Sequence, residues 1–100
     1  MIVKELKLKN FRNYEDETFL FDEKVNIIHG SNAQGKTNIL EAIYYFSLGK
    51  SQRAKKDAEI IKIGAEQSDI TIKFCDEKRE NTAEVNIYKN RKKSIKVNDI

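Results

Sequence analysis

The chain has 100 residues, of which 39% are apolar, so it has side chains for one modest core and for no more than one domain. Its 19 basic residues nearly balance 16 acidic ones, and a net charge of +3 favours solubility without indicating a polyanionic partner. The alternating first ten residues predict neither a signal peptide nor a membrane span, and the single cysteine, Cys75, leaves no intramolecular disulfide and indicates a reducing, cytoplasmic location.

The first segment with a regular pattern is 2–8, where apolar and charged side chains alternate. Ile2, Leu6 and Leu8 share one face, with lysines on the other. A period of two is typical of a half-buried strand, so we expect a strand here. Residues 11–16 read as a connection after it.

Two short apolar runs follow, at 17–21 and 25–29, separated by the acidic turn 22–24. Together they predict a hairpin. The second run is almost continuously apolar, as expected of a strand that is covered on both faces.

From Lys36 the apolar spacing becomes helical. Two neighbouring stripes result, Ile39, Ile43 and Phe46 on one and Leu40, Tyr44 and Leu48 on the next. This pattern predicts a wide, largely buried helix. Gly49 stands where a left-handed C-terminal cap would end it.

The second half of the chain is predicted to be rich in strands. A basic loop at 50–56 and a short apolar segment at 58–63 come first, closed by Gly64. Alternating segments then predict strands at 70–74, 83–88 and 94–97, with turns at 76–79 and 90–93. The expected fold is α/β: a strand and a helix followed by an antiparallel, β-rich segment.

One motif carries clear chemistry. Gly30, Ser31, Asn32, Ala33, Gln34, Gly35, Lys36 and Thr37 match G-x-x-x-x-G-K-[ST], the phosphate-binding P-loop or Walker A motif, between a predicted strand and a predicted helix. The glycines let backbone N–H groups turn inward around phosphates, and the helix start adds the positive end of its dipole. Lys36 supplies a mobile charge to the β and γ phosphates, and the Thr37 hydroxyl can ligate a Mg²⁺. With average residue frequencies, a chance match in a chain of this length has a probability under about 1%.

The surrounding residues extend the motif to a family. Residues 30–49 read GSNAQGKTNILEAIYYFSLG, F-R-N-Y stands at 11–14, and K-S-x-R stands at 50–53. Over essentially the whole chain the sequence resembles the RecF family of DNA replication and repair ATPases, which are ABC-type ATPases related to the heads of SMC and Rad50 proteins. The resemblance implies an ABC-type ATPase lobe carrying the Walker A motif, from about the first quarter to third of a longer protein.

The resemblance also implies roles for single residues. Residues 30–37 would hold the triphosphate of ATP, with Lys36 as the catalytic residue, and Asn38 would lie close to the same phosphates. Arg12, in F-R-N-Y, would approach the nucleotide from the neighbouring strand end, although a solvated arginine in a connection is the alternative. Gln52 stands where family members often have a histidine or an aromatic residue.

For the whole protein, the resemblance implies an ATP-binding protein of recombination, gap repair and the SOS-type response. ATP would drive formation of a homodimer that binds double-stranded or gapped DNA and works with other recombination mediator proteins. The parent would be a slow, DNA-stimulated ATPase. In residues 38–100 no apolar run leads into an acidic pair, so the Walker B motif is missing, as is the signature segment, and we do not expect hydrolysis by this stretch alone.

Two basic clusters are candidate DNA contacts, because sequence-independent binding is made mainly through phosphates. Solvated turn residues, or charges that protect edge strands from pairing, are the alternative. The candidates are Lys50, Arg53, Lys55 and Lys56 after the helix, and Arg91, Lys92 and Lys93 in a predicted turn.

Three other functions stay open at this point. An SMC-like or Rad50-like head would continue into a long coiled coil, which heptads beyond residue 100 would reveal. A P-loop phosphotransferase would need lid arginines, and no group of them stands out here. A folding or interaction module without nucleotide affinity is the third.

Overall fold

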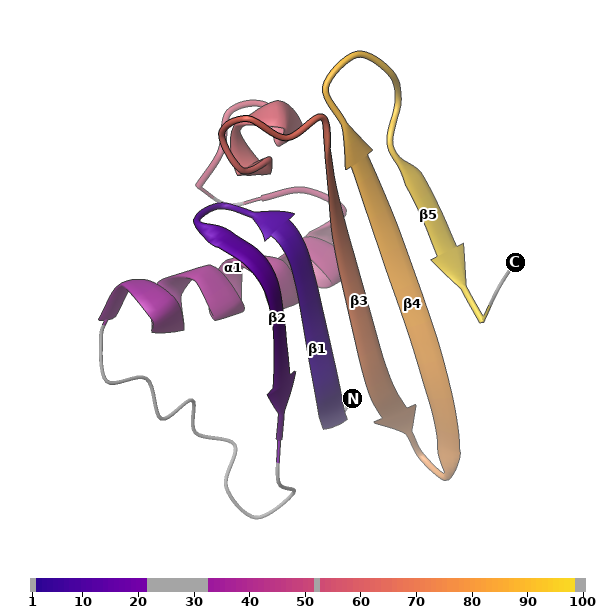
Figure 1. Ribbon diagram of the computed structural model, residues 1–100. Coiled ribbons are helices and arrows are strands. Elements are labelled where there is room, and N and C mark those ends of the chain that lie inside the picture. Colours follow the sequence, from indigo (N-terminus) through magenta and orange to yellow (C-terminus); the bar gives the residue numbers. More distant parts are fainter. Residues whose placement is uncertain (1, 22–32, 52, 99–100) are drawn as a thin grey trace.

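The structure of the protein, a computed structural model, describes residues 2–21, 33–51 and 53–98, and for residues 33–36 it describes the backbone. Within these ranges five strands form one antiparallel sheet in the order β2-β1-β3-β4-β5, and helix α1 lies across one face of it (Figure 1). The elements are β1 (Ile2–Phe11), β2 (Tyr14–Leu20), α1 (Ala33–Leu48), the 3-10 helix η1 (Asp57–Ile60), β3 (Gln67–Asp76), β4 (Arg79–Tyr88) and β5 (Ser94–Val97). The expected α/β class, with an antiparallel β-rich second half, is confirmed.

The first two strands form a tight hairpin. Phe11 pairs with Tyr14, so only Arg12 and Asn13 connect the strands, and the connection predicted at 11–16 is too long. Residues 17–20 pair with β1, a partner that the sequence did not predict. The predicted strand at 25–29 lies outside the described residues.

A β-bulge in β1 shifts the alternation of its side chains. Leu6 and Leu8 are buried as predicted, but Ile2 is 44% exposed. The register against β3 slips between Val3 and Glu5, so Val3 pairs with Phe74 and takes the place on the core face that Ile2 was expected to have. One extra residue in a strand moves every side chain beyond it to the other face, and a count of alternating residues does not detect this.

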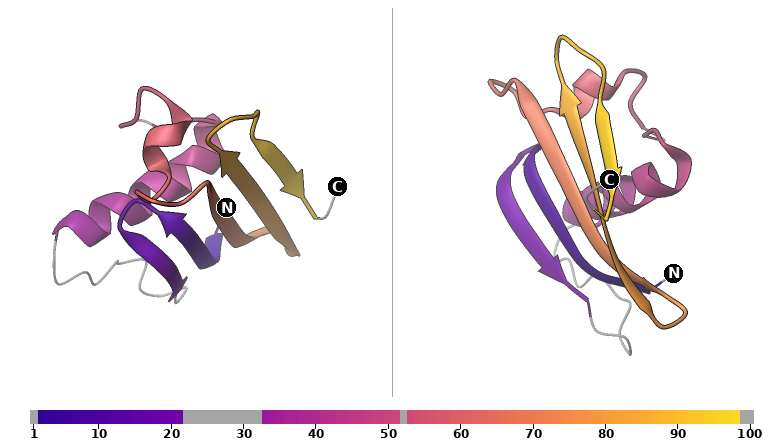
Figure 2. Two further views of the ribbon diagram at one scale, coloured as in Figure 1. Left: turned by 45° about the horizontal axis from the view of Figure 1, so that its top comes forward. Right: turned by 90° about the vertical axis from the view of Figure 1, so that its right-hand side faces the viewer.

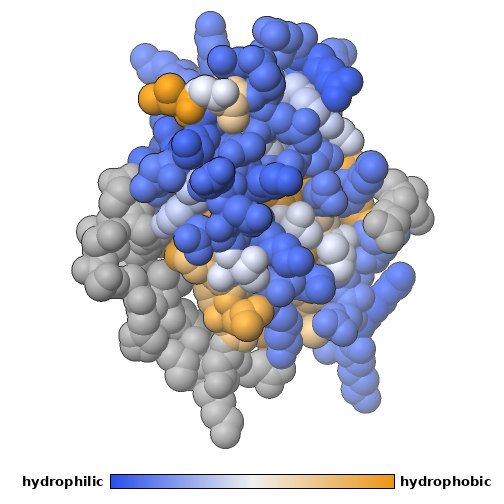
Figure 3. All heavy atoms as spheres, in the orientation of Figure 1, coloured by the Kyte–Doolittle hydropathy of each residue, from blue (hydrophilic) through white to orange (hydrophobic). Residues whose placement is uncertain are grey.

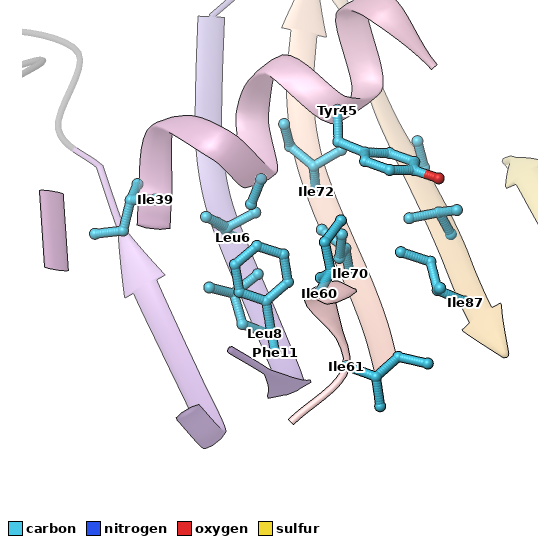
Figure 4. Close-up of a cluster of buried hydrophobic side chains, with 13 residues drawn as sticks. Leu6, Leu8, Phe11, Ile39, Tyr45, Ile60, Ile61, Ile70, Ile72 and Ile87 are labelled. Atoms are coloured by element: carbon cyan, nitrogen blue, oxygen red, sulfur yellow. The ribbon is translucent and has the colours of Figure 1, made fainter. Parts of the chain in front are cut away.

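The core lies between the sheet and α1. Side chains from β1, β3 and β4 point toward the helix and meet Ile39, Ala42 and Tyr45 from α1 (Figure 4). Burial of such apolar surface is the main force that holds the helix on the sheet. The sheet residues of this cluster are Leu6, Leu8, Phe11, Ile70, Ile72, Ala83, Val85 and Ile87.

Helix α1 buries one stripe and exposes the other. Leu40, Tyr44 and Leu48 are 39%, 43% and 50% exposed, so the prediction of a largely buried helix was wrong for this side. The predicted helix end is confirmed, since Gly49 has φ +74° and its N–H donates to the carbonyl of Tyr45 at 2.7 Å.

Within the described residues, no helix covers the face of the sheet opposite to α1. Figure 2 shows the twisted sheet with the helix on one side only, and Figure 3, which views this opposite face, shows mostly hydrophilic side chains. Strands β3 and β4 are longer than predicted, because their polar residues continue the ladder beyond the apolar runs, whereas β5 has the predicted bounds. No helix in the described part of the chain is both long and apolar enough to cross a membrane.

The segment after α1 folds back onto the β1–β2 turn. The N–H of Arg12 donates to the carbonyl of Ile60 at 2.7 Å, and the N–H of Lys62 donates to the carbonyl of Asn10 at 2.8 Å. Ile61 also forms an isolated bridge with Phe11. The β1–β2 turn and the segment after α1, which are far apart in the sequence, therefore meet at one place.

Candidate functional site

The phosphate-loop motif is described only in part. Residues 30–32 lie outside the described residues, and α1 begins at Ala33, inside the motif. The first turn of α1 contains no acidic residue, so no carboxylate there opposes an anion at the positive end of the helix dipole. Thr37 is exposed and Asn38 is buried one position further along the helix. A first helical turn without acids, followed by an exposed Thr37, is therefore compatible with a bound triphosphate.

A buried carboxylate, Glu41, lies one helical turn beyond the motif. Its side chain is fully buried, and it forms a two-bond pair with the guanidinium of Arg12. The Nε of Arg12 donates to Oε1 at 2.9 Å, and the Nη2 of Arg12 donates to Oε2 at 2.6 Å. Such bidentate pairs fix the plane of both groups, so α1 holds the β1–β2 turn in a defined orientation.

The loop after α1 binds the same carboxylate. The Ser51 hydroxyl donates to Oε2 of Glu41, and its oxygen accepts the N–H groups of Arg53 and Ala54 at 3.0 Å each. Arg53 adds one bond from Nη1 to Oε1 of Glu41 at 3.2 Å. Glu41 thus joins all three segments.

Asn38 forms the second polar centre of the site. Its side-chain amide nitrogen donates to the side-chain oxygen of Asn13 at 3.1 Å, and its side-chain oxygen accepts a hydrogen bond from Nη1 of Arg53 at 2.9 Å. Asn13 is in the two-residue β1–β2 turn. The two polar residues on the buried side of α1, Asn38 and Glu41, therefore contact the same two segments.

The charges in this cluster stabilise one another. Burial alone would raise the pKa of Glu41, but hydrogen bonds from Arg12 and Ser51, together with the charges of Arg12 and Arg53, lower it overall. The hydrogen bond from Glu41 raises the pKa of Arg12. Glu41 is therefore ionised at neutral pH and paired with two guanidinium groups.

A shallow pocket of about 420 Å³ opens beside this cluster. It combines cationic side chains with apolar ones, of which Ile63 is 97% exposed. Guanidinium and amide donors beside an apolar wall suit a ligand with both anionic and flat apolar parts. The lining residues are Arg12, Asn13, Arg53, Glu59, Ile61 and Ile63.

Both predicted basic clusters contain exposed cations and cations that contact other groups of the protein. Lys50, Lys55, Lys56, Arg91 and Lys92 are exposed. Arg53 is in the network described above, and Arg91 lies 3.9 Å above the ring of Tyr88.

Lys93 has contacts of its own, to the end of α1 and to η1. Its ammonium donates to the carbonyl of Gly49 at 2.6 Å, lies 3.4 Å from the carboxylate of Asp57, and is 4.9 Å from the ring centre of Tyr45. Lys93 is thus bound to the protein itself.

Sequence reasoning named Arg12, Asn38 and Arg53 but missed Glu41, Ser51 and Asn13. A signal for Glu41 was present. Positions 38, 41, 42 and 45 follow the helical spacing of one buried face, and an acid on such a face requires partners. The partners themselves come from other segments, which spacing within the helix does not reveal.

An α/β unit whose phosphate-loop motif opens a helix packed on a sheet defines the class of P-loop nucleotide-binding proteins. The chain belongs to the AAA domain family, whose family model matches residues 5–99. The resemblance to RecF is also confirmed. Over all of its residues the chain is 48% identical to a protein named DNA replication and repair protein RecF from Clostridium tetani, and 46% identical to one of the same name from Clostridium novyi. It spans 27% and 28% of the length of these curated relatives.

Solved structures agree with this assignment. The chain superposes on a structure described as the recombination mediator protein RecF-ATPrS in the RecFOR pathway with a TM-score of 0.86 and 39% identity, covering 97% of this chain and 26% of the other. It superposes on the SMC head domain from Thermotoga maritima with a TM-score of 0.77 and 22% identity, covering 100% of this chain and 38% of that one. The second likeness shows a shared fold.

Proposed function

We propose that this chain is the phosphate-binding lobe of an ATP-dependent DNA replication and repair protein of the RecF type. The observation that carries the proposal is the convergence of the family's sequence motifs on one site: Arg12, Asn38 and Arg53, from three separate segments, meet beside the start of α1. The relatives named DNA replication and repair protein RecF support the wider function.

In this proposal residues 30–37 hold the β and γ phosphates of ATP. The backbone N–H groups of the loop and the first turn of α1 face the phosphates, and Lys36 neutralises their charge. A Mg²⁺ held by Thr37 would neutralise further charge on the same phosphates. The RecF structures described with ATPrS and ATP are consistent with this ligand.

Arg12 and Asn38 border the same site. Asn38 follows Lys36 by two residues, which is about 3 Å along a helix axis, and Asn13 and Arg53 are bonded to it. The guanidinium of Arg12 is bonded to Glu41, which lies about 7.5 Å beyond Lys36 along the helix axis. We assign it the role of binding the nucleotide from the strand end.

The whole protein would act as a switch. ATP bound between two copies would drive a cytoplasmic homodimer whose joint surface binds double-stranded or gapped DNA, and slow hydrolysis would release it. The exposed basic residues of both clusters, Lys50, Lys55, Lys56, Arg91 and Lys92, would contribute sequence-independent phosphate contacts. Other recombination mediator proteins would be its partners, as the RecFOR pathway named for the solved relative suggests.

The experiment that tests this function uses the protein at the full length of its relatives. ATP and Mg²⁺ are titrated into the wild type and into Lys36→Ala, while light scattering follows the oligomeric state and anisotropy follows binding to a labelled gapped duplex. We expect ATP to promote both dimer and DNA binding in the wild type alone. A wild-type protein that stays monomeric and binds DNA equally without ATP contradicts the switch.

A further inference from the structure

We propose that Glu41 is a positioning residue of the nucleotide site, which fixes the guanidinium of Arg12 for the ligand without touching the ligand itself. The inference rests on the proposed function, because it takes Arg12 to bind the nucleotide. It adds that Glu41 acts through Arg12, and it gives a reason why Glu41 is buried.

The hydrogen-bonding capacity of Glu41 is already used. A carboxylate has about four lone-pair positions, and four donors occupy them. Oε1 accepts from the Nε of Arg12 and the Nη1 of Arg53, and Oε2 accepts from the Nη2 of Arg12 and the hydroxyl of Ser51. With its side chain fully buried as well, Glu41 has neither the exposure nor the free lone pairs to bind a nucleotide or a metal ion.

Within the described residues, the guanidinium of Arg12 has N–H donors that no hydrogen bond uses. It carries five N–H donors, and within the described residues two of them donate to Glu41. A third, on Nη1, makes a long contact of 3.4 Å with the carbonyl of Glu59. One N–H on each terminal nitrogen is left over. The side chain is 23% exposed and lines the pocket between the β1–β2 turn and the segment after α1, so Glu41 holds the guanidinium on one side while the remaining donors are open to a ligand.

The backbone at Arg12 supports a functional role for its side chain. Its φ of +54° lies in the left-handed region, where a residue with a β-carbon is disfavoured and where glycine or asparagine is usual in a two-residue turn. Strained positions of this kind persist where the surrounding contacts hold them, and they gather at binding sites. Here the contacts are the bond from the backbone N–H to Ile60 and the pair with Glu41.

The contacts of Glu41 favour Arg12 over Arg53. The formal charges around the pocket balance, because the guanidinium groups of Arg12 and Arg53 stand against the carboxylates of Glu41 and Glu59. One carboxylate oxygen of Glu59 accepts hydrogen bonds from the backbone N–H groups of Lys55 and Lys56 at 2.6 and 3.2 Å, whereas both oxygens of Glu41 accept from Arg12. Of the two cations, Arg12 is held by two bonds and Arg53 by one, so Glu41 orients Arg12 more strictly.

A double-mutant cycle in the full-length protein tests the proposal. Calorimetry measures the affinity for Mg-ATP of the wild type, Glu41→Gln, Arg12→Gln and the double variant, with the exposed Glu80→Gln as a matched control. We expect each single variant to lose about tenfold in affinity, the control to lose nothing, and the double variant to bind no more weakly than either single one. Wild-type affinity in Glu41→Gln, or full additivity in the double variant, would overturn it, because a purely structural carboxylate does not depend on Arg12.

Two further variants keep the outcomes separable. If circular dichroism shows that Glu41→Gln does not fold, Arg12→Lys takes its place: it keeps the charge but cannot form the side-on pair. Loss of affinity in Arg12→Lys supports positioning, and wild-type affinity overturns it. Lys36→Ala tests the proposed function itself: undiminished ATP binding in that variant contradicts a nucleotide site at residues 30–37. If Lys36→Ala loses affinity while Glu41→Gln binds ATP as the wild type does, only the role of Glu41 is refuted.

Discussion

Replacement of Lys93 by methionine should loosen the β4–β5 connection from α1. The ammonium of Lys93 bonds to the carbonyl of Gly49 at 2.6 Å, forms an ion pair with Asp57 at 3.4 Å and lies over the ring of Tyr45. Methionine keeps the length of the stem and removes the charge. The change therefore isolates the polar contacts.

The size of the effect follows from the exposure of these groups. A hydrogen bond from a charged donor at a partly exposed site contributes about 1 kcal/mol. The ion pair, with side chains 31% and 36% exposed, contributes at most about 0.5 kcal/mol, and the cation–π contact at 4.9 Å contributes about 0.5 kcal/mol. Since the three share one ammonium, we expect a total loss of about 1 to 2 kcal/mol.

Urea denaturation of the protein measures this loss, with the exposed neighbour Lys92→Met as the matched control. Lys93→Met should lower the midpoint, whereas Lys92→Met should leave it within about 0.5 kcal/mol of the wild type. If both variants are equally stable, Lys93 is only another solvated lysine and the reasoning is refuted. DNA titrations should give the opposite result for the two variants. Lys92→Met should reduce the salt dependence of DNA affinity by about one phosphate contact, and Lys93→Met should leave it unchanged.

Three further predictions concern stability. Because the pKa of Glu41 is lowered in the folded protein, its contribution to stability is present above the usual glutamate pKa of about 4.3 and is lost as the pH falls through the lower folded value. Glu41→Gln should therefore flatten the acid limb of a curve of stability against pH. An unchanged acid limb would contradict this role of Glu41. Tyr45→Phe should cost about 1 kcal/mol in urea denaturation, because it removes the 2.9 Å hydrogen bond to Asp57, and an equally stable variant would show that this bond contributes nothing. Val3→Asp should destabilise more than Ile2→Asp in thermal melts, because the bulge places Val3 against the core; the reverse order would mean that β1 has no bulge.

The sequence predicted the helix and the second half of the sheet well, because their signals are local. The helical spacing after Lys36, the cap at Gly49 and the alternation at 94–97 depend only on neighbouring residues. The pairing of 17–20 with β1 was not predicted, since strand pairing depends on turn geometry that a left-handed Arg12 provides and that its residue type does not suggest.

Prediction of the site had a similar limit. The phosphate-loop motif and the resemblance to RecF identified Arg12, Asn38 and Arg53, but nothing in the chain order indicated that one carboxylate joins two of them. Glu41 makes its contacts with segments 29, 10 and 12 positions away, and these contacts exist only once α1 is packed on the sheet. The exposure of the stripe with Leu40 was also not predicted, because apolar spacing alone does not indicate which of two stripes faces the sheet.

The central claim, a triphosphate held at the start of α1, is tested most directly by the equilibrium affinity for Mg-ATP of the wild type and Lys36→Ala, with the exposed Lys50→Ala as control. Removal of a charged donor to a phosphate weakens binding by roughly 1.5 to 3 kcal/mol. We predict that Lys36→Ala loses at least about tenfold in affinity while Lys50→Ala binds as the wild type does. Equal affinity in all three proteins would contradict the claim.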